Sequence, residues 1–176
     1  MFMTFPAMNL CILDFRRRNP VIIKLKNGID YFLLKREGEY YLLTDQKEKT
    51  DSSFEWWRTH YRKKIDPYDE CVEECYDVSF HVIYDVGIPG VTDNWILLGD
   101  SDPSKGIVYL NDGNNHEGWE FVDRNWSRKR IDFCDVKDQY LEKKISIKNG
   151  RKCDPKRKER VYMSKKEFAE FWMNSL

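Results

Sequence analysis

The sequence predicts an α+β fold: a single domain over residues 1–176, a largely antiparallel sheet, two short helices in the middle and one C-terminal helix. Three observations predict this fold. They are a meander of hairpins near the N-terminus, two helix-start motifs in the middle of the chain, and a third motif near its end. Strands and helices come in blocks without regular alternation, which favours an antiparallel sheet. The length suits one domain that buries its own core.

Residues 21–44 predict a three-stranded meander that begins the sheet. Its first turn falls at Asn27-Gly28, the pair preferred in type I′ hairpin turns because both central residues need a positive φ. Two further apolar runs follow, separated by Glu37-Gly38. The pattern therefore predicts two tight turns between three neighbouring strands.

Two motifs in the middle of the chain predict short helices. Ser52 and Glu55 have the spacing of a capping box, so a helix is expected to run to about residue 64. Asp66 followed by Pro67 supplies an N-cap acid and a proline at the first helical position. The apolar residues that follow, up to residue 76, recur at helical spacing and predict one buried stripe.

The second half of the chain predicts more strands and the closing helix. Residues 78–86 alternate between apolar and polar positions, as in a half-buried strand. Further strands are predicted at 94–98, 106–110, 119–122 and 131–136. A basic loop is expected at 151–160, and a second capping box, Ser164 with Glu167, opens the last helix.

Charge is distributed unevenly along a chain whose total charge is zero. Residues 66–123 contain fourteen acidic residues and one basic residue, whereas residues 124–166 contain sixteen basic and six acidic residues. Such asymmetry indicates charged interaction surfaces or internal pairing. Because exposed ion pairs contribute little stability, we expect the acidic and basic blocks to lie on different faces. A shorter apolar and basic segment, 1–20, begins the chain.

Composition excludes some classes of protein. Apolar residues make up 41% and aromatic residues 15%, which excludes a disordered chain. Five cysteines, an odd number, favour a reduced, cytoplasmic protein. No stretch approaches the ~18 apolar residues of a membrane span, so no membrane partner is expected. Cys71, Cys75 and His81 lack an evident fourth zinc ligand, and we interpret the two cysteines as buried core residues without metal.

No strong catalytic or cofactor motif is present, so no catalytic residue, metal ligand or cofactor is assigned. A cysteine-dependent hydrolase remains the third hypothesis, with Cys11 or Cys134 paired to His81 or His116, although nothing flanking these cysteines favours a pair. Whether the chain is an enzyme is left open, leaning against it. The oxygen-rich segment 111–117 has the wrong spacing for a calcium loop, and we interpret it as a hairpin loop.

The leading hypothesis is a small binding protein that acts on another protein, as an interaction module or an inhibitor of the immunity type. An acidic face can steer and orient a basic partner. The alternative is nucleic-acid binding by the basic and aromatic C-terminal third, because cations track phosphates and rings stack on bases; residues 56–64 also interleave both kinds of side chain. The same polarity would suit a homodimer. The candidate binding surface combines cations, acids and one indole: Trp126, Arg128, Arg130, Lys152, Arg157, Lys158, Asp100, Asp102, Asp112 and Glu117.

Overall fold

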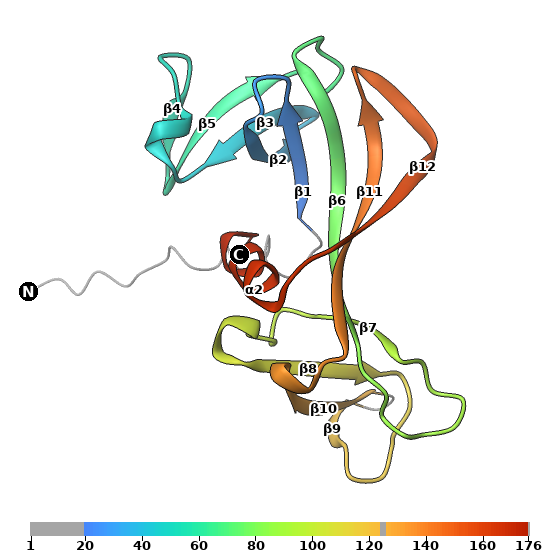
Figure 1. Ribbon diagram of the computed structural model, residues 1–176. Helices are drawn as coiled ribbons and strands as arrows, with labels where there is room; N and C mark the ends of the chain where they lie inside the picture. The colour runs from blue at the N-terminus through green and yellow to red at the C-terminus, as the bar shows by residue number, and fades with distance from the viewer. Residues whose placement is uncertain (1–19, 124–125, 176) are drawn as a thin grey trace, which may run out of the picture. The chain divides into compact units, whose positions relative to one another are not determined.

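The computed structural model describes residues 20–123 and 126–175, without the side chains of the last two (Figure 1). The protein is mostly antiparallel β-sheet, with 55% of its residues in strands and 12% in helices. One α-helix, α2 (Lys165–Ser175), occurs among the described residues. The α+β expectation is therefore wrong in its two central helices, whereas the antiparallel sheet and the closing helix are present.

The strands form two sheets. The nine-stranded sheet has the order β12-β11-β6-β1-β2-β3-β5-β4, with β7 paired to β6, and the three-stranded sheet has the order β8-β10-β9. The strands of the larger sheet are β1 (Val21–Leu25), β2 (Asp30–Arg36), β3 (Glu39–Thr44), β4 (Glu55–Trp57), β5 (His60–Ile65), β6 (Val72–Ile83), β7 (Asn94–Ile96), β11 (Asp138–Lys148) and β12 (Arg151–Tyr162). Those of the smaller sheet are β8 (Ile107–Asp112), β9 (Glu120–Asp123) and β10 (Trp126–Asp132). Three 3-10 turns complete the elements: η1 (Lys47–Lys49), η2 (Pro103–Lys105) and η3 (Phe133–Asp135).

The chain divides into two compact units, and each is described by itself. Unit 1 comprises Met1–Val78 and Lys143–Glu159, and unit 2 comprises Ser79–Glu142 and Arg160–Leu176. The division falls within β6, β11 and β12. The expectation of a single domain stays a prediction. Segment 1–20 lies outside the described residues except for Pro20.

The predicted meander is confirmed in unit 1 as β1, β2 and β3, which pair in antiparallel order. The type I′ turn, however, lies at the second connection. Glu37 and Gly38 both have a positive φ, of 52° and 85°. At the first turn only Gly28 does, with a φ of 83°, and Asn27 does not. A two-residue connection with both φ values positive matches the twist of the flanking strands.

The predicted central helices are replaced by strands and turns. Residues 55–57 and 60–65 form β4 and β5, because the aromatic residues there favour strands and β5 pairs with β3. Asp66 accepts a hydrogen bond from the Tyr68 backbone N–H at 3.0 Å, and Asp69 accepts one from that of Cys71 at 2.8 Å. The same acid that would cap a helix here closes an Asx turn. β6 then begins at Val72.

β6 explains why the expected helical stripe and half-buried strand were both inaccurate. It lies between β11 and β1, so both its edges are paired, and its side chains are buried along most of its length without alternation. One core cluster of unit 1 contains Val72 and Cys75 of β6, Ile147 of β11, and Ile23 and Leu42 of the meander. The alternation that the sequence shows from residue 78 therefore does not correspond to alternating burial along β6.

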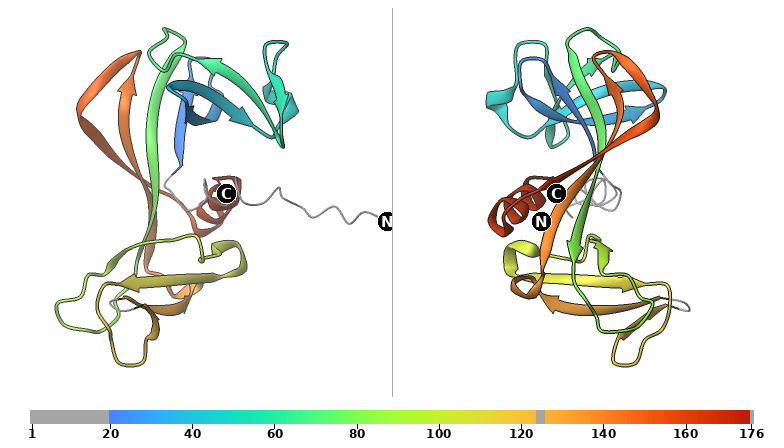
Figure 2. Two further views of the ribbon diagram at one scale, coloured as in Figure 1. Left: turned by 180° about the vertical axis from the view of Figure 1, so that it is seen from behind. Right: turned by 45° about the vertical axis from the view of Figure 1, so that its right-hand side comes forward.

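Unit 2 contains the three-stranded sheet, seen from two further sides in Figure 2, and α2. The predicted capping box is confirmed: the Ser164 backbone N–H donates to Glu167 Oε2 at 2.9 Å, and the Glu167 N–H donates to Ser164 Oγ at 3.3 Å. The helix buries Phe168 and Trp172, which lie 5.5 and 4.7 Å from the ring of Phe80 on β6. Residues 133–135 form η3, so the strand expected at 131–136 ends early.

Two loop predictions in the second half are also wrong. Residues 151–160 belong to β12, an edge strand next to β11, and do not form a basic loop. The connection 113–119 joins β8 to β9, but β10 lies between these two strands, so it crosses the sheet and is no hairpin loop.

Candidate functional site

The structure separates the candidate binding surface into two groups. Lys152, Arg157 and Lys158 lie on β12 in unit 1. The other candidates lie in unit 2, and they are Trp126, Arg128, Arg130, Asp100, Asp102, Asp112 and Glu117. The proposed surface is therefore not one site within either unit.

The charge blocks of the sequence are redistributed by the fold. Unit 1 contains 21 basic and 16 acidic residues, for a net +5, and unit 2 contains 9 basic and 14 acidic residues, for a net −5. Each unit takes part of both blocks. Inside unit 1, Lys156 pairs with Asp77 at 2.7 Å and Lys143 with Glu74 at 3.6 Å. The expectation that the blocks occupy different faces stays a prediction.

Arg128 on β10 is the centre of an ion-pair cluster in unit 2. Its Nε and Nη2 donate to the two carboxylate oxygens of Glu120 at 2.7 and 2.9 Å, and its Nη1 donates to Asp100 at 2.9 Å. The guanidinium also lies 4.7 Å from the ring centre of Tyr109. The Arg128 hydrogen bonds hold the pKa of Glu120 below its usual value. A fork of this geometry ties β9 to β10 and leaves two carboxylates around one cation.

β9 is an exposed edge strand beside this cluster. All four of its residues are exposed, and Phe121 and Val122 retain 63% and 52% of their accessible surface. Trp126, the first residue of β10, lies directly opposite Asp123 of β9 and is 49% exposed. Phe121 and Val122 are consecutive and so lie on opposite faces of β9, and an edge strand that exposes large apolar side chains is a candidate interaction site.

The two edge strands β9 and β12 differ in chemistry. β12 contains Pro155 and a high density of lysine and arginine, which are the usual means of protecting an edge from further strands. β9, with the sequence Glu-Phe-Val-Asp, has neither. The edge of β9 is therefore protected only by its short length and its two acidic residues, whereas β12 carries a proline and many cations.

The loop between β8 and β9 is held in place by side chains of unit 2. His116 Nε2 lies 2.5 Å from Asp112 Oδ2, and this contact holds the pKa of Asp112 below its usual value. The ring of Trp119 lies 4.9 Å from His116 and 5.7 Å from the buried Trp95. Ser127 Oγ donates to the Asn114 carbonyl at 2.5 Å. Asp112 thus anchors the loop that leads into β9.

Three other predicted residues have more local settings. Asp102 caps η2, accepting from Ser104 Oγ at 2.5 Å and from the Lys105 N–H at 3.3 Å. Glu117 is exposed in the loop before β9. Arg130 lines an open depression of about 390 Å³ together with Tyr84, Lys129, Ile131, Asp132 and Asp135. Basic and acidic side chains both line this depression, so its charge favours no single class of ligand.

A buried polar network in unit 2 has the connectivity of a hydrolase triad. Ser79 Oγ lies 3.0 Å from His81 Nε2, and His81 Nδ1 lies 3.2 Å from Asn94 Oδ1. Asn94 Nδ2 donates to the Tyr140 hydroxyl at 2.8 Å, and the Tyr140 ring stacks on His81 at 4.8 Å. Ser79 and His81 are only 4% and 6% exposed, and Tyr140 is fully buried. A nucleophile must reach its substrate, so we interpret this network as a satisfied polar core.

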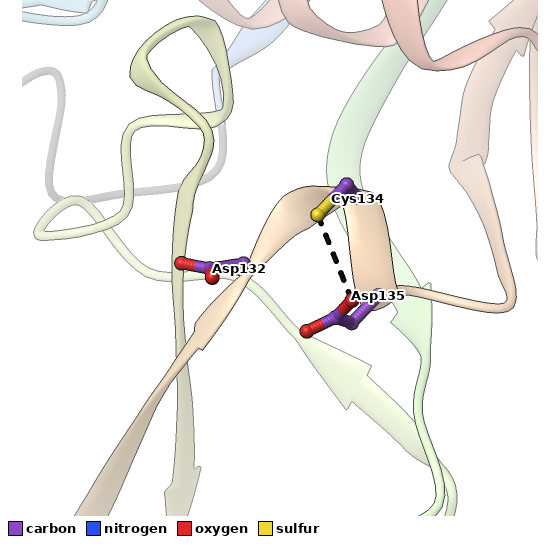
Figure 3. A group of neighbouring side chains, drawn as sticks. All are labelled: Asp132, Cys134 and Asp135. Carbon is purple, nitrogen blue, oxygen red and sulfur yellow. Dashed lines mark hydrogen bonds between the residues drawn. The ribbon is translucent and has the colours of Figure 1, made fainter.

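One group of side chains offers metal-ligating atoms within the described residues. Asp132, Cys134 and Asp135 have ligand atoms within 4.8 Å of one another, and Figure 3 shows the Cys134 thiol directed at Asp135, at 3.6 Å. All three residues are exposed, and the Lys165 ammonium donates to the Cys134 carbonyl. Structural zinc takes four ligands, usually nitrogen or sulfur, and this group supplies three with one sulfur.

The cysteine predictions are confirmed for one residue and wrong for another. Cys75 is buried, and burial raises the pKa of its thiol to about 11. Cys71 is exposed, because it lies at the Asx turns before β6 and not on a helix. The hydrolase pairs are also disfavoured: His81 is held by the buried network, and His116 by Asp112. Cys11 lies outside the described residues.

The sequence analysis missed Phe121 and Val122. The available signal was an apolar pair flanked by the acids Glu120 and Asp123 in a predicted strand. That pattern does not reveal that the strand lies at an edge, which is decided by β10 pairing with β8 and β9.

Comparison with known proteins found no matching family model, no matching curated protein and no matching solved structure. Within the described residues, no helix has the length and apolar character needed to cross a membrane.

Proposed function

We propose that the protein is a protein-binding module whose unit 2 accepts an extended, basic segment of a partner along the outer edge of β9. The observation that carries this proposal is an edge strand with exposed Phe121 and Val122 and without lysine, arginine or proline. Added strands bind through backbone hydrogen bonds, and neighbouring side chains supply specificity.

The charge around β9 selects the partner. Glu120 and Asp123 lie on the strand, and Asp100 is joined to Glu120 through Arg128. Unit 2 as a whole carries a net −5. An extended segment that alternates apolar and basic residues would place its apolar side chains on the face of Phe121 and its cations on the face of Glu120. A reduced, cytoplasmic setting belongs to the same proposal, supported by four free cysteines among the described residues.

The Arg128 cluster would hold β9 in its strand conformation in the free protein, before the partner binds. Its three hydrogen bonds join β9, β10 and the segment at Asp100, so less order has to be gained on binding. Removal of the guanidinium would loosen the edge strand itself. The proposal therefore gives Arg128 a positioning role and gives Phe121, Val122 and Trp126 the direct contact.

The test uses the full chain and a fluorescein-labelled octapeptide of alternating valine and lysine. We expect saturable binding by fluorescence anisotropy, and about 10-fold weaker binding, as for a hot-spot residue, in Phe121→Ala or Trp126→Ala. Trp56→Ala is the matched control, since Trp56 is a tryptophan of unit 1 that is exposed at least as much as Trp126.

Three results would overturn the proposal. They are equal binding of a peptide with glutamate in place of lysine, no effect of Phe121→Ala and Trp126→Ala, and a doubled mass of the free protein that Phe121→Ala abolishes. The last result would assign the β9 edge to self-association.

A further inference from the structure

In unit 1, Trp57 on β4 is surrounded by guanidinium groups. The Cζ atoms of Arg58, Arg62 and Arg36 lie 4.7, 4.9 and 5.5 Å from its ring. Arg62 also lies 5.2 Å from the ring of Tyr41. These separations are within the ~6 Å range of cation–π attraction. Positive charge and aromatic surface are therefore held together at one end of the larger sheet.

Strand register explains how residues from several strands reach this place. Glu55 lies opposite Arg62, and Trp57 opposite His60, so these four residues share one face of the β4–β5 hairpin. Arg62 in turn lies opposite Leu43 on β3, which extends the same face. The positive cluster is thus a sheet face and not a loop feature.

Trp56 occupies the opposite face of the same hairpin. It lies opposite Tyr61, meets that ring edge-on at 4.9 Å, and remains 61% exposed. Exposure of more than half of a large indole on an edge strand brings little structural benefit, since tryptophan is highly buried on average. A single ring contact covers only part of the indole, and the 61% of Trp56 that stays exposed is available to a planar ligand.

The turn that joins β4 to β5 has a strained residue. Arg58 has a φ of 57°, a left-handed conformation that is uncommon for residues with a side chain. This conformation accompanies the closest of the three cation–π contacts to Trp57. A positive φ is a feature of tight turns, as at Glu37, and here it places the guanidinium of Arg58 beside Trp57 without itself indicating a ligand.

The cations on this face have exposed carboxylate partners. Arg62 pairs with Glu55 at 2.5 Å, and Arg36 with Glu37 at 3.3 Å; the two acids are 64% and 82% exposed. Exposed pairs of this kind are weak, and phosphate offers arginine the same two-point geometry with more charge. A phosphate can therefore displace these carboxylates.

We propose that unit 1 binds a single-stranded polynucleotide at the β4–β5 hairpin. The polynucleotide passes around the outer edge of β4, the last strand of the larger sheet, so a base stacks on Trp56 on one face while flanking phosphates contact Arg58 in the turn and Arg62 on the other face. An unpaired strand suits the site because its bases can separate to admit an indole, whereas bases in a duplex are already stacked. Unit 1 carries a net +5, which favours a polyanion. RNA and DNA share this chemistry, and the experiment distinguishes them.

The test measures anisotropy of fluorescein-labelled twelve-nucleotide oligo(U) and oligo(dT), and of a twelve-base-pair duplex, with the full chain at about 50 mM salt. We expect single strands to bind more tightly than the duplex. Trp56→Ala is expected to weaken binding about 10-fold, the effect of losing one stacked base. Arg58→Glu is expected to lower the salt slope by about 1. A preference for oligo(U) would identify RNA, and a preference for oligo(dT) would identify DNA.

A matched control distinguishes a local binding site at the β4–β5 hairpin from attraction to the overall charge of unit 1. Lys152→Glu changes the charge of unit 1 as much as Arg58→Glu, and Lys152 is 69% exposed on β12. Equal loss in both variants would assign binding to the overall field of unit 1 and overturn the site. Absence of single-strand binding, or equal binding of the duplex, would overturn it too. Trp126→Ala is expected to leave oligonucleotide binding unchanged. The oligonucleotide proposal can therefore fail without affecting the proposal that β9 binds a peptide.

Discussion

Arg128 and Glu120 meet through two parallel hydrogen bonds, Nε to Oε2 at 2.7 Å and Nη2 to Oε1 at 2.9 Å, across the β9–β10 pair. Fork-to-fork contacts of this type have more geometric specificity than a contact between point charges. Lysine cannot reproduce this contact. The pair fixes the edge strand that we propose as the binding surface.

The first prediction concerns pH. Arg128 lowers the folded-state pKa of Glu120 below its ordinary value of 4.5. A lowered pKa contributes stability that is present above pH 4.5 and is lost as the pH falls through the folded value. Glu120→Gln should therefore be less stable than the wild type at pH 7, and the difference should narrow towards pH 3.

The measurement is the melting temperature of the wild type and Glu120→Gln at a series of pH values. Glu117→Gln is the matched control, because Glu117 is an exposed acid in the loop that leads into β9. A difference between the wild type and Glu120→Gln that stays constant from pH 7 to pH 3 would contradict the prediction.

The second prediction compares two serines that have the same capping-box spacing. Ser164 caps α2, so Ser164→Ala should lower the free energy of unfolding by about 1 kcal/mol. Ser52→Ala should leave it nearly unchanged, because Ser52 precedes a strand. Urea unfolding followed by circular dichroism measures both, and equal losses would argue that residues 52–64 are helical after all.

The third prediction concerns the turn between β2 and β3. Gly38→Ala should destabilise the protein by about 1 kcal/mol, because a φ of 85° is unfavourable for alanine. Glu37→Gly should be neutral to stabilising. Relief of left-handed strain, about 1–2 kcal/mol, is offset by the freedom that glycine adds to the unfolded chain, about 0.4–1 kcal/mol. Urea midpoints of both variants check this, and the opposite order of stability would disprove the turn assignment.

The fourth prediction separates a structural from a catalytic role for Ser79. Ser79→Ala should lower the free energy of unfolding by about 1–3 kcal/mol, because His81 loses a buried hydrogen-bond partner. The folded wild type should not react with a fluorophosphonate probe, since Ser79 is 4% exposed. Stoichiometric labelling that Ser79→Ala abolishes would restore the hydrolase hypothesis.

The candidate site was only partly predictable. Charge order and aromatic content directed attention to Trp126, Arg128 and Asp100, which the structure does bring into unit 2, with Arg128 and Asp100 in direct contact. Lys152 and Arg157 belong to the other unit, because β12 and β10 are close in sequence but are sorted into different sheets. A linear charge run carries no information about which strand pairs with which.

Features decided within a few residues could be determined from the sequence alone. They are the meander of β1 to β3 and the capping box at Ser164, because hairpin turns and helix caps depend on neighbouring side chains and backbone groups. Features that depend on distant partners were decided only by the tertiary structure. The Asp66 carboxylate can cap a helix or close an Asx turn, and residues 60–65 became a strand because β3 offered an edge to pair with. β6 is paired at both edges and β9 at only one for the same reason. A strand's place in its sheet is set by long-range pairing that no local pattern encodes.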